Sequence, residues 1–366
     1  MSESVLTVNI VLDKKSLEVP YTSITTAEDV CIYVCRNLNI GPLARHLFAL
    51  RITGKTIFLT PSASFGPKYL VFDFRIRFKV SKLHNLRKLD LKAYDYYFHQ
   101  TRLDVLYNEI PDIVYEKCKK ELVGLGITDM YRVMLEKDLP KESVENDYKK
   151  YIRKEVLKRH AFFIKKPIRE TLGKLQKTKH DVWFVKEEYL NQLNMLAPDY
   201  LSETYKAATD QDGSIFNIFV KVSPGNSSSE TSIPEIKYCL ENKMENWHLI
   251  GTIEDMAFVS IRIDGTVEIS RRNGIPFYLK FNSLPIMWSF ISHLDGYYRL
   301  ACKWTFNICK DATTPSLQKL YMMKCHGPVG GEFSYAKLEE KRSNRPGCFI
   351  IRKVNPNTTN ILLMFV

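Results

Sequence analysis

The chain has 366 residues, 45% of them hydrophobic, and a formal net charge of +12 from 53 Lys and Arg against 41 Asp and Glu. This length and apolar content allow more than one buried core, so we expect several domains. No run of eighteen apolar residues and no signal segment after Met1 occur, which excludes membrane-spanning and secreted classes and predicts a soluble, intracellular protein. The eight cysteines form no CxxC pair and have no His at zinc-site spacing, so we expect free thiols, no metal and no cofactor.

Residues 1–82 are predicted to form a ubiquitin-like β-grasp lobe. Alternating apolar side chains on both sides of a turn over 6–19 indicate a strand hairpin. Thr26, with Asp29 three residues later, predicts the start of a helix. Over 72–80 the alternation is complete and predicts a half-buried strand. Its polar face carries Asp73, Arg75, Arg77 and Lys79.

Residues 83–206 change to a helical period and predict an all-α lobe. Helices are expected over 91–110, 128–136 and 186–196. The second of these carries three apolar residues that are candidates for a groove binding a proline-rich peptide, because Met surfaces adapt to such ligands. Core packing is the alternative for these residues, which are Met130, Val133 and Met134.

The positive charge is concentrated in residues 149–179, which contain twelve Lys and Arg against two Glu, a net charge of +10. Such a patch favours an acidic partner, either anionic lipid or an acidic peptide, while a solvated helix face is the competing interpretation. No aromatic platform accompanies it, so we expect no nucleic-acid binding. The candidate contacts are Lys158, Arg159, Lys165 and Lys166. The same run contains the apolar residues Tyr151, Val156, Leu157 and Phe163, within the part of the chain that has a helical period.

Residues 207–308 are predicted to form a β lobe that ends in a helix. Asp264-Gly265 and Asn273-Gly274 lie between alternating segments and are strong hairpin signals. Ser283 can cap the closing helix, with Pro285 in its first turn. A sandwich or barrel closed by a C-terminal helix is typical of pleckstrin-homology and phosphotyrosine-binding domains.

After a linker at 309–320, residues 321–366 resemble the N-terminal half of an SH2 domain. A short loop from His326, a helix over 332–341 and a strand ending in Arg352 occur in the order found there. A guanidinium on a buried strand can bind two phosphate or carboxylate oxygens with little loss of entropy, so Arg352 is the candidate phosphotyrosine or acidic-residue contact. An ordinary strand with a terminal Arg is the alternative. An SH2 domain needs about a hundred residues, so we expect the domain to be incomplete in this chain.

Two departures from the SH2 pattern weaken the phosphotyrosine assignment. Gly331 occupies the place of a second phosphate-binding Arg, and Lys353 and Val354 replace the usual acidic and hydroxyl residues.

The order of ubiquitin-like, helical and pleckstrin-like lobes resembles a FERM domain, and a FERM domain followed by SH2 resembles the Janus kinases. The segment from Ser289 to Leu300 (SFISHLDGYYRL) is similar to the end of the FERM domain in that family, and Cys325-His326-Gly327-Pro328 is similar to its SH2 entry. The resemblance implies an α+β multidomain chain that binds cytoplasmic tails of cytokine receptors. It places a proline-rich receptor motif on the helical lobe and a second motif on the SH2 portion.

The same resemblance implies a cytoplasmic protein, peripheral at the inner face of the plasma or endosomal membrane, whose parent continues into pseudokinase and tyrosine kinase domains. The chain itself contains no kinase glycine-rich loop, VAIK-like Lys, HRD or DFG motif, so we expect no catalysis from it. Two alternatives stay open: a FERM adaptor that links membrane proteins to the cortical cytoskeleton, and an enzymatic role that belongs to the parent kinase.

Overall fold

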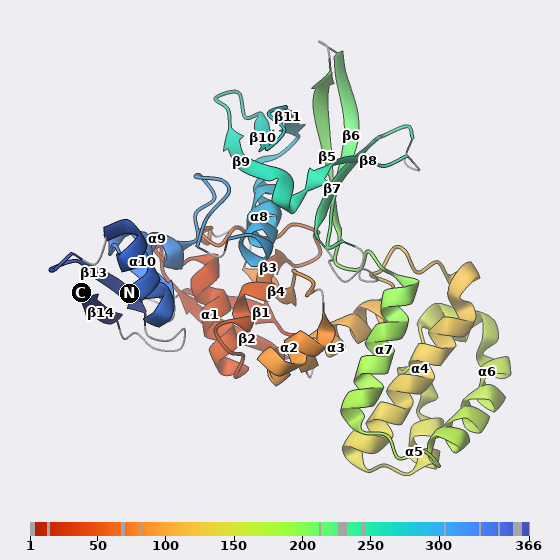
Figure 1. Ribbon diagram of the computed structural model, residues 1–366. Helices are drawn as coiled ribbons and strands as arrows, with labels where there is room; N and C mark the ends of the chain where they lie inside the picture. The colour runs from red at the N-terminus through yellow and green to blue at the C-terminus, as the bar shows by residue number, and fades with distance from the viewer. Residues whose placement is uncertain are drawn as a thin grey trace.

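The computed structural model describes residues 4–12, 15–66, 70–80, 82–211, 214–225, 233–243, 246–303, 305–328, 331–342, 345–353 and 361–365. Figure 1 shows a small β lobe, a helical lobe that extends to one side, a larger β lobe and a C-terminal segment on the opposite side. No helix in the described ranges is both long and apolar enough to cross a bilayer.

The first lobe is a four-stranded sheet with a helix packed on it. Its strand order is β2-β1-β4-β3, with β1 parallel to β4 and the other pairs antiparallel. The predicted helix start is confirmed: the Asp29 N–H donates to the Thr26 hydroxyl at 3.3 Å, and the Thr26 N–H donates to the Asp29 carboxylate at 2.9 Å. The elements are β1 (Ser4–Asn9), β2 (Ser16–Tyr21), α1 (Ala27–Asn37), the 3-10 helix η2 (Ala44–Leu47), β3 (Phe48–Ile52) and β4 (Val71–Ile76).

The strand predicted over 72–80 is shorter than expected, since β4 ends at Ile76. Arg77 therefore does not lie on a solvent-facing polar side. It is buried, with 2% of its surface exposed.

In the helical lobe, α4 lies between α6 and α7, and α6 is the outermost helix in Figure 1. The predicted helices correspond to α3, α4 and α7. Helix α3 ends at Tyr107, three residues before the predicted end, and α4 begins well before the predicted start. Helix α6 has a kink at His160, where φ is −136° and ψ is 16°, and contains Pro167. The elements are α2 (Leu83–Leu89), α3 (Leu91–Tyr107), α4 (Tyr115–Lys137), α5 (Lys141–Asn146), the 3-10 helix η3 (Tyr148–Lys150), α6 (Lys154–Leu175) and α7 (Val182–Leu196).

The third lobe is a seven-stranded antiparallel sheet of order β8-β7-β6-β5-β11-β10-β9, closed by α8. Gly265 and Gly274 both have φ of +79°, which the predicted hairpin turns require. Ser283 caps α8 as predicted, accepting from the Ile286 N–H at 3.4 Å. The elements are β5 (Glu203–Gln211), β6 (Ser214–Ser223), β7 (Glu235–Leu240), β8 (His248–Thr252), the 3-10 helix η4 (Ile253–Asp255), β9 (Met256–Ile261), β10 (Val267–Arg271), β11 (Phe277–Phe281) and α8 (Leu284–Ala301).

The C-terminal segment contains α9 (Pro315–Met322), β12 (His326–Pro328), α10 (Gly331–Arg342), β13 (Phe349–Lys353) and β14 (Ile361–Phe365). Its three strands form a sheet of order β12-β13-β14, with β12 parallel and β14 antiparallel to β13. Helix α9 begins inside the stretch predicted as a linker. The domain limits drawn from the sequence remain a proposal.

Candidate interaction surfaces

The four cations singled out from the sequence lie together on the exposed side of α6. Lys158, Arg159, Lys165 and Lys166 are all exposed. The first two precede the kink at His160 and the last two follow it. Their acidic partners are few: Arg159 lies 3.2 Å from Glu116, and Lys166 lies 3.9 Å from Glu170. This face therefore presents a strong positive field at the outer edge of the lobe.

Packing between α4 and α6 positions Arg159. The Arg159 guanidinium lies over the Tyr115 ring at 4.7 Å, and the His160 ring stacks on the same Tyr at 6.1 Å between centroids. Tyr115 is the first residue of α4 and is itself buried. The stacking holds the Arg159 head group beside the end of α3.

An open depression of about 520 Å³ lies where the end of α3 meets the start of α6. Arg153 forms its buried edge: Nη1 donates to the Ile113 carbonyl at 3.1 Å and Nη2 donates to Glu155 at 2.9 Å. Its Nε is buried and has no hydrogen-bond partner among the described residues. The depression is thus lined by both apolar and cationic side chains. The lining residues are Leu106, Tyr107, Asn108, Arg153, Lys154, Glu155, Lys158 and Arg159.

The three apolar residues predicted to line a peptide groove do not lie on the surface. Met130, Val133 and Met134 are at most 7% exposed and belong to the core of the helical lobe. Helix α4 is covered by α6 and α7, so these side chains fill the space between helices. The expectation of an exposed groove at these positions is corrected, and the core alternative describes them.

Arg352 lies on β13, directly opposite His326 of β12. Its Nη2 would lie 3.9 Å from a Cβ built on Gly331, so the guanidinium sits beside the first residue of α10. The N-terminus of a helix attracts negatively charged groups through its dipole, and a guanidinium attracts them through its positive charge. This arrangement is compatible with binding a carboxylate or a phosphate.

A buried polar cluster around Arg77 joins the first lobe to the third, and the sequence pattern did not reveal it. Nε and Nη2 donate to the two oxygens of Glu203 at 2.7 and 2.9 Å. Nη1 donates to the Ser292 hydroxyl at 2.9 Å, and Nη2 also donates to the Ser289 carbonyl at 2.7 Å. Burial lowers the pKa of the neighbouring His293 to about 3, so this imidazole is neutral. Among the residues that the structure describes, Arg77 therefore supplies the positive charge that balances Glu203.

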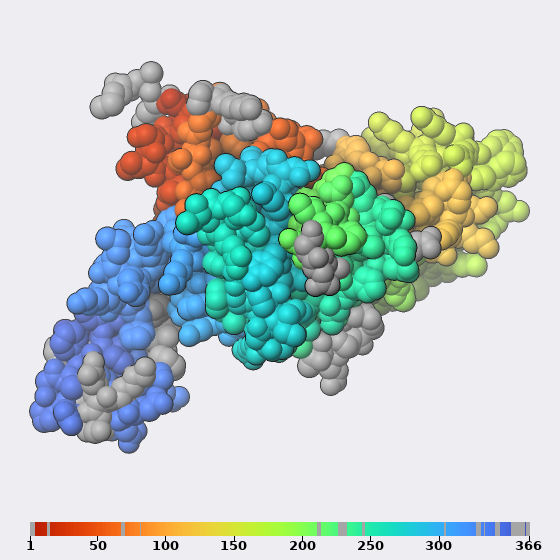
Figure 2. Space-filling model, turned by 90° about the horizontal axis from the view of Figure 1, so that it is seen from above, coloured from red at the N-terminus to blue at the C-terminus, as the bar shows by residue number. Residues whose placement is uncertain are grey.

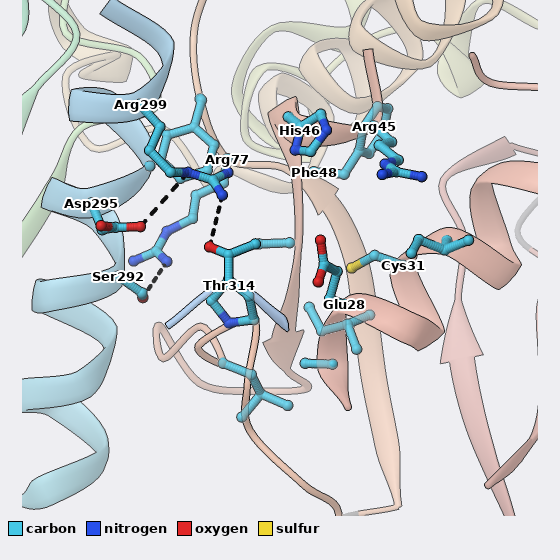
Figure 3. A pocket seen from close by; sticks show the side chains of 18 residues that line it. Glu28, Cys31, Arg45, His46, Phe48, Arg77, Ser292, Asp295, Arg299 and Thr314 are labelled. Atoms are coloured by element: carbon cyan, nitrogen blue, oxygen red, sulfur yellow. Dashed lines mark hydrogen bonds and ion pairs between the residues drawn. The ribbon is translucent and has the colours of Figure 1, made fainter. Parts of the chain in front are cut away.

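A cavity of about 70 Å³ adjoins this cluster between α1, η2 and α8, and Figure 3 shows its side chains converging. Arg299 donates to the Thr314 hydroxyl at 2.7 Å and lies 3.7 Å from Asp295. Small-molecule pockets usually measure about 300–1,000 Å³. Because this cavity is much smaller and Arg299 pairs with Asp295 at its edge, we infer that its residues hold the lobes together and do not bind a ligand.

The segment after α8 is held against both β lobes. Asp295 accepts from the Ile308 N–H and from the Asn307 amide, each at 2.8 Å. The Ser316 N–H and hydroxyl donate to Glu28 of α1 at 2.8 and 2.6 Å. Burial raises the pKa of Asp295 to about 6. These bonds fix the start of α9, and with it the C-terminal segment, relative to the first lobe.

Comparison with known proteins identifies the FERM fold. The FERM F1 ubiquitin-like domain family model matches residues 8–93. The FERM and C-terminal domain complex of Drosophila Merlin aligns with a TM-score of 0.55 at 14% identity, covering 81% of this chain and 95% of that one. The Dictyostelium discoideum myosin VII MyTH4-FERM MF2 domain aligns with a TM-score of 0.53 at 13% identity, covering 80% of this chain and 58% of that one. A ubiquitin-like lobe, a helical lobe and a β lobe of FERM type are therefore present.

Sequence comparison relates the chain to Janus-type kinases. Tyrosine-protein kinase hopscotch of Drosophila melanogaster is 26% identical over 89% of this chain and 34% of its own length. Tyrosine-protein kinase JAK3 of Rattus norvegicus is 23% identical over 92% of this chain and 33% of its own length. The chain thus spans about a third of the length of the curated relatives it matches. Homology to the Janus kinases over their FERM region, predicted from the motifs, is confirmed.

Proposed function

We propose that this homologue of the FERM region of Janus kinases is a non-catalytic docking module for the cytoplasmic tail of a cytokine receptor. The observation that carries the proposal is the depression at the junction of α3 and α6. It combines an apolar rim, Leu106 and Tyr107, with the cations Arg153, Lys158 and Arg159. A tail segment that contains proline and acidic residues suits this combination, because extended proline segments bind with little ordering entropy and acidic side chains pair with the cations.

The C-terminal segment supplies a second proposed contact in an SH2-like arrangement. The position of the Arg352 guanidinium beside the start of α10 supports binding of an acidic residue or a phosphotyrosine of the same tail. Arg352→Ala should weaken the binding of a tail peptide that carries this acidic group. Arg352→Lys should restore only part of the affinity, because the bidentate fork is lost. Equal affinity of the wild type and Arg352→Ala, measured by calorimetry, would remove Arg352 from the site.

Receptor docking places the module at the inner face of a cellular membrane, and the basic face of α6 supports that orientation. Each Lys or Arg near an anionic leaflet contributes on the order of 1 kcal/mol and is screened by salt. We infer a cytoplasmic protein held at the membrane by its receptor and by anionic lipids.

Two pairs of charge reversals on one helix test the docking site. Lys158→Glu with Arg159→Glu changes the lining of the depression, whereas Lys165→Glu with Lys166→Glu changes exposed cations outside it. We expect the first pair to weaken calorimetric binding of a membrane-proximal receptor-tail peptide strongly and to flatten the salt dependence of the remaining affinity. The second pair should have a much smaller effect. Equal losses from both pairs would show only a general attraction to the basic face.

A further inference from the structure

Two adjacent phenylalanines protrude from the basic face of α6. Phe162 is 85% exposed and Phe163 is 73% exposed, and their rings meet edge to face with centroids 5.8 Å apart. The sequence pattern had grouped Phe163 with the apolar residues of this helix. Single large apolar side chains are common on protein surfaces. Two adjacent exposed aromatic rings form an apolar patch, and its contact with water is unfavourable.

The exposure of these rings is not the result of a detached helix. Ile164, Ile168 and Leu172 of the same helix are buried in the lobe. They fix which side of α6 faces the core, and the two Phe side chains face away from it. Pro167 has no N–H to donate to the Phe163 carbonyl, which leaves that carbonyl to water or another donor. The rings are therefore held outward by a packed helix.

Positively charged residues flank the two phenylalanines in the sequence. Lys158 and Arg159 precede them, and Lys165 and Lys166 follow them, all exposed. Figure 1 shows α6 as the outer helix of the lobe, and Figure 2 shows the helical lobe at the opposite end of the molecule from the C-terminal segment. The patch is thus a pair of exposed apolar rings, flanked by cations, on the outer helix at one end of the molecule.

We propose that Phe162 and Phe163 form a wedge that inserts into the headgroup–acyl boundary of an anionic membrane leaflet. Aromatic side chains partition into this boundary, and cations on the same helix remain at the level of the lipid phosphates. A protruding tip suits a planar, deformable surface, whereas a peptide is better held in the neighbouring depression. This inference rests on the proposed function, in which the basic face of α6 lies against the membrane. It adds a hydrophobic contact by named residues to the electrostatic one.

The test uses the whole chain and vesicles of phosphatidylcholine with or without phosphatidylserine. Phe162→Ser with Phe163→Ser changes no charge, and we expect vesicle partitioning to fall about tenfold or more at every salt concentration. Lys165→Gln with Lys166→Gln should instead reduce the steepness of the salt dependence. Met195→Ser is the matched control: Met195 is 77% exposed in α7 of the same lobe, and its replacement should leave partitioning unchanged. Wild-type partitioning by the Phe double variant would overturn the proposal.

A depth measurement separates insertion from surface attraction. Phe163→Trp should add an emission that shifts to the blue on anionic vesicles and is quenched by lipids brominated in the acyl chain. No shift and no quenching would overturn the proposal even if the protein bound the vesicles. All variants should share the wild-type melting temperature, because the replaced side chains are exposed.

Two further outcomes have definite meanings. A dimer mass in solution that Phe162→Ser with Phe163→Ser abolishes, together with unchanged vesicle binding, would assign the patch to a second copy and overturn the wedge. Loss of vesicle insertion in this variant with unchanged binding of the receptor-tail peptide supports the wedge and leaves the docking site intact. Failure of peptide binding in the wild type would instead contradict the proposed function, whatever the vesicles show.

Discussion

Removal of the Arg77 side-chain charge is expected to loosen the junction between the first and third lobes. Arg77→Met keeps a flexible, unbranched side chain, although a shorter one, and removes the donors to Glu203 and Ser292. The Glu203 carboxylate, with only 14% of its side chain exposed, then loses its ion-pair partner. Breaking a buried pair from one side costs about 3–5 kcal/mol, because the remaining charge stays desolvated.

A double-mutant cycle gives the sharper form of this prediction. Glu203→Gln removes the charge left behind, so Arg77→Met with Glu203→Gln should be less destabilising than Arg77→Met alone. Arg262→Met is the matched control, because Arg262 lies 2.9 Å from Glu268 and its own side chain is 51% exposed, against 1% for Arg77. Exposed pairs contribute about 0–1 kcal/mol. We therefore expect a small effect of Arg262→Met on the free energy of unfolding.

Amide hydrogen exchange measures the opening of the junction directly, since it reports local as well as global unfolding. Arg77→Met should accelerate exchange in β5 and at the end of β4, while α4 in the helical lobe keeps its wild-type protection. A loss below about 1 kcal/mol for Arg77→Met would refute the role assigned to this ion pair. Strict additivity of the two substitutions in the cycle would refute it as well.

Two more predictions concern α8. Burial lowers the pKa of His293 from 6.5 to about 3, so the folded state keeps this ring neutral while the unfolded state binds a proton below pH 6.5. Its stability contribution is complete above that pH and is lost as the pH falls toward 3, by about 1.4 kcal/mol per pH unit. Between pH 6.5 and 3, His293→Gln should make the free energy of unfolding fall less steeply with decreasing pH, by about 1.4 kcal/mol per pH unit. An unchanged slope would contradict this pKa. Gly296→Val should prevent stable folding, because a Cβ there would lie 2.1 Å from the Phe78 ring, whereas Gly124→Ala, with nothing within 4 Å, should keep or raise the melting temperature.

Local patterns were sufficient for the elements whose formation depends on neighbours in the chain. The Thr26 cap, the glycine turns at 265 and 274 and the Ser283 cap were predicted from a few adjacent residues and are present. Their hydrogen bonds close within a few positions, so no distant segment is needed to specify them. The lobe order followed from the change between the two-residue period of strands and the helical period.

Which apolar residues are buried could not be decided in the same way. Met130 and Phe163 both lie on helices at positions that allow a core or a surface role. Packing against α6 and α7 buries Met130, whereas α6 turns Phe163 outward because Ile164 and Ile168 occupy its inner side. Helical spacing relates residues to one another but does not say which stripe a neighbouring helix will cover.

The sequence by itself determined the FERM lobes, the basic segment and the strand that carries Arg352, because each depends on periodicity, charge or order along the chain. Only the tertiary structure decided the role of Arg77. Alternation placed it on a polar strand face, but β4 ends at Ile76 and the side chain enters a site built by β5 and α8, with Glu203 and Ser289 more than a hundred residues away in the chain. A charge can be buried there only because those distant groups supply a carboxylate and a carbonyl at hydrogen-bonding distance.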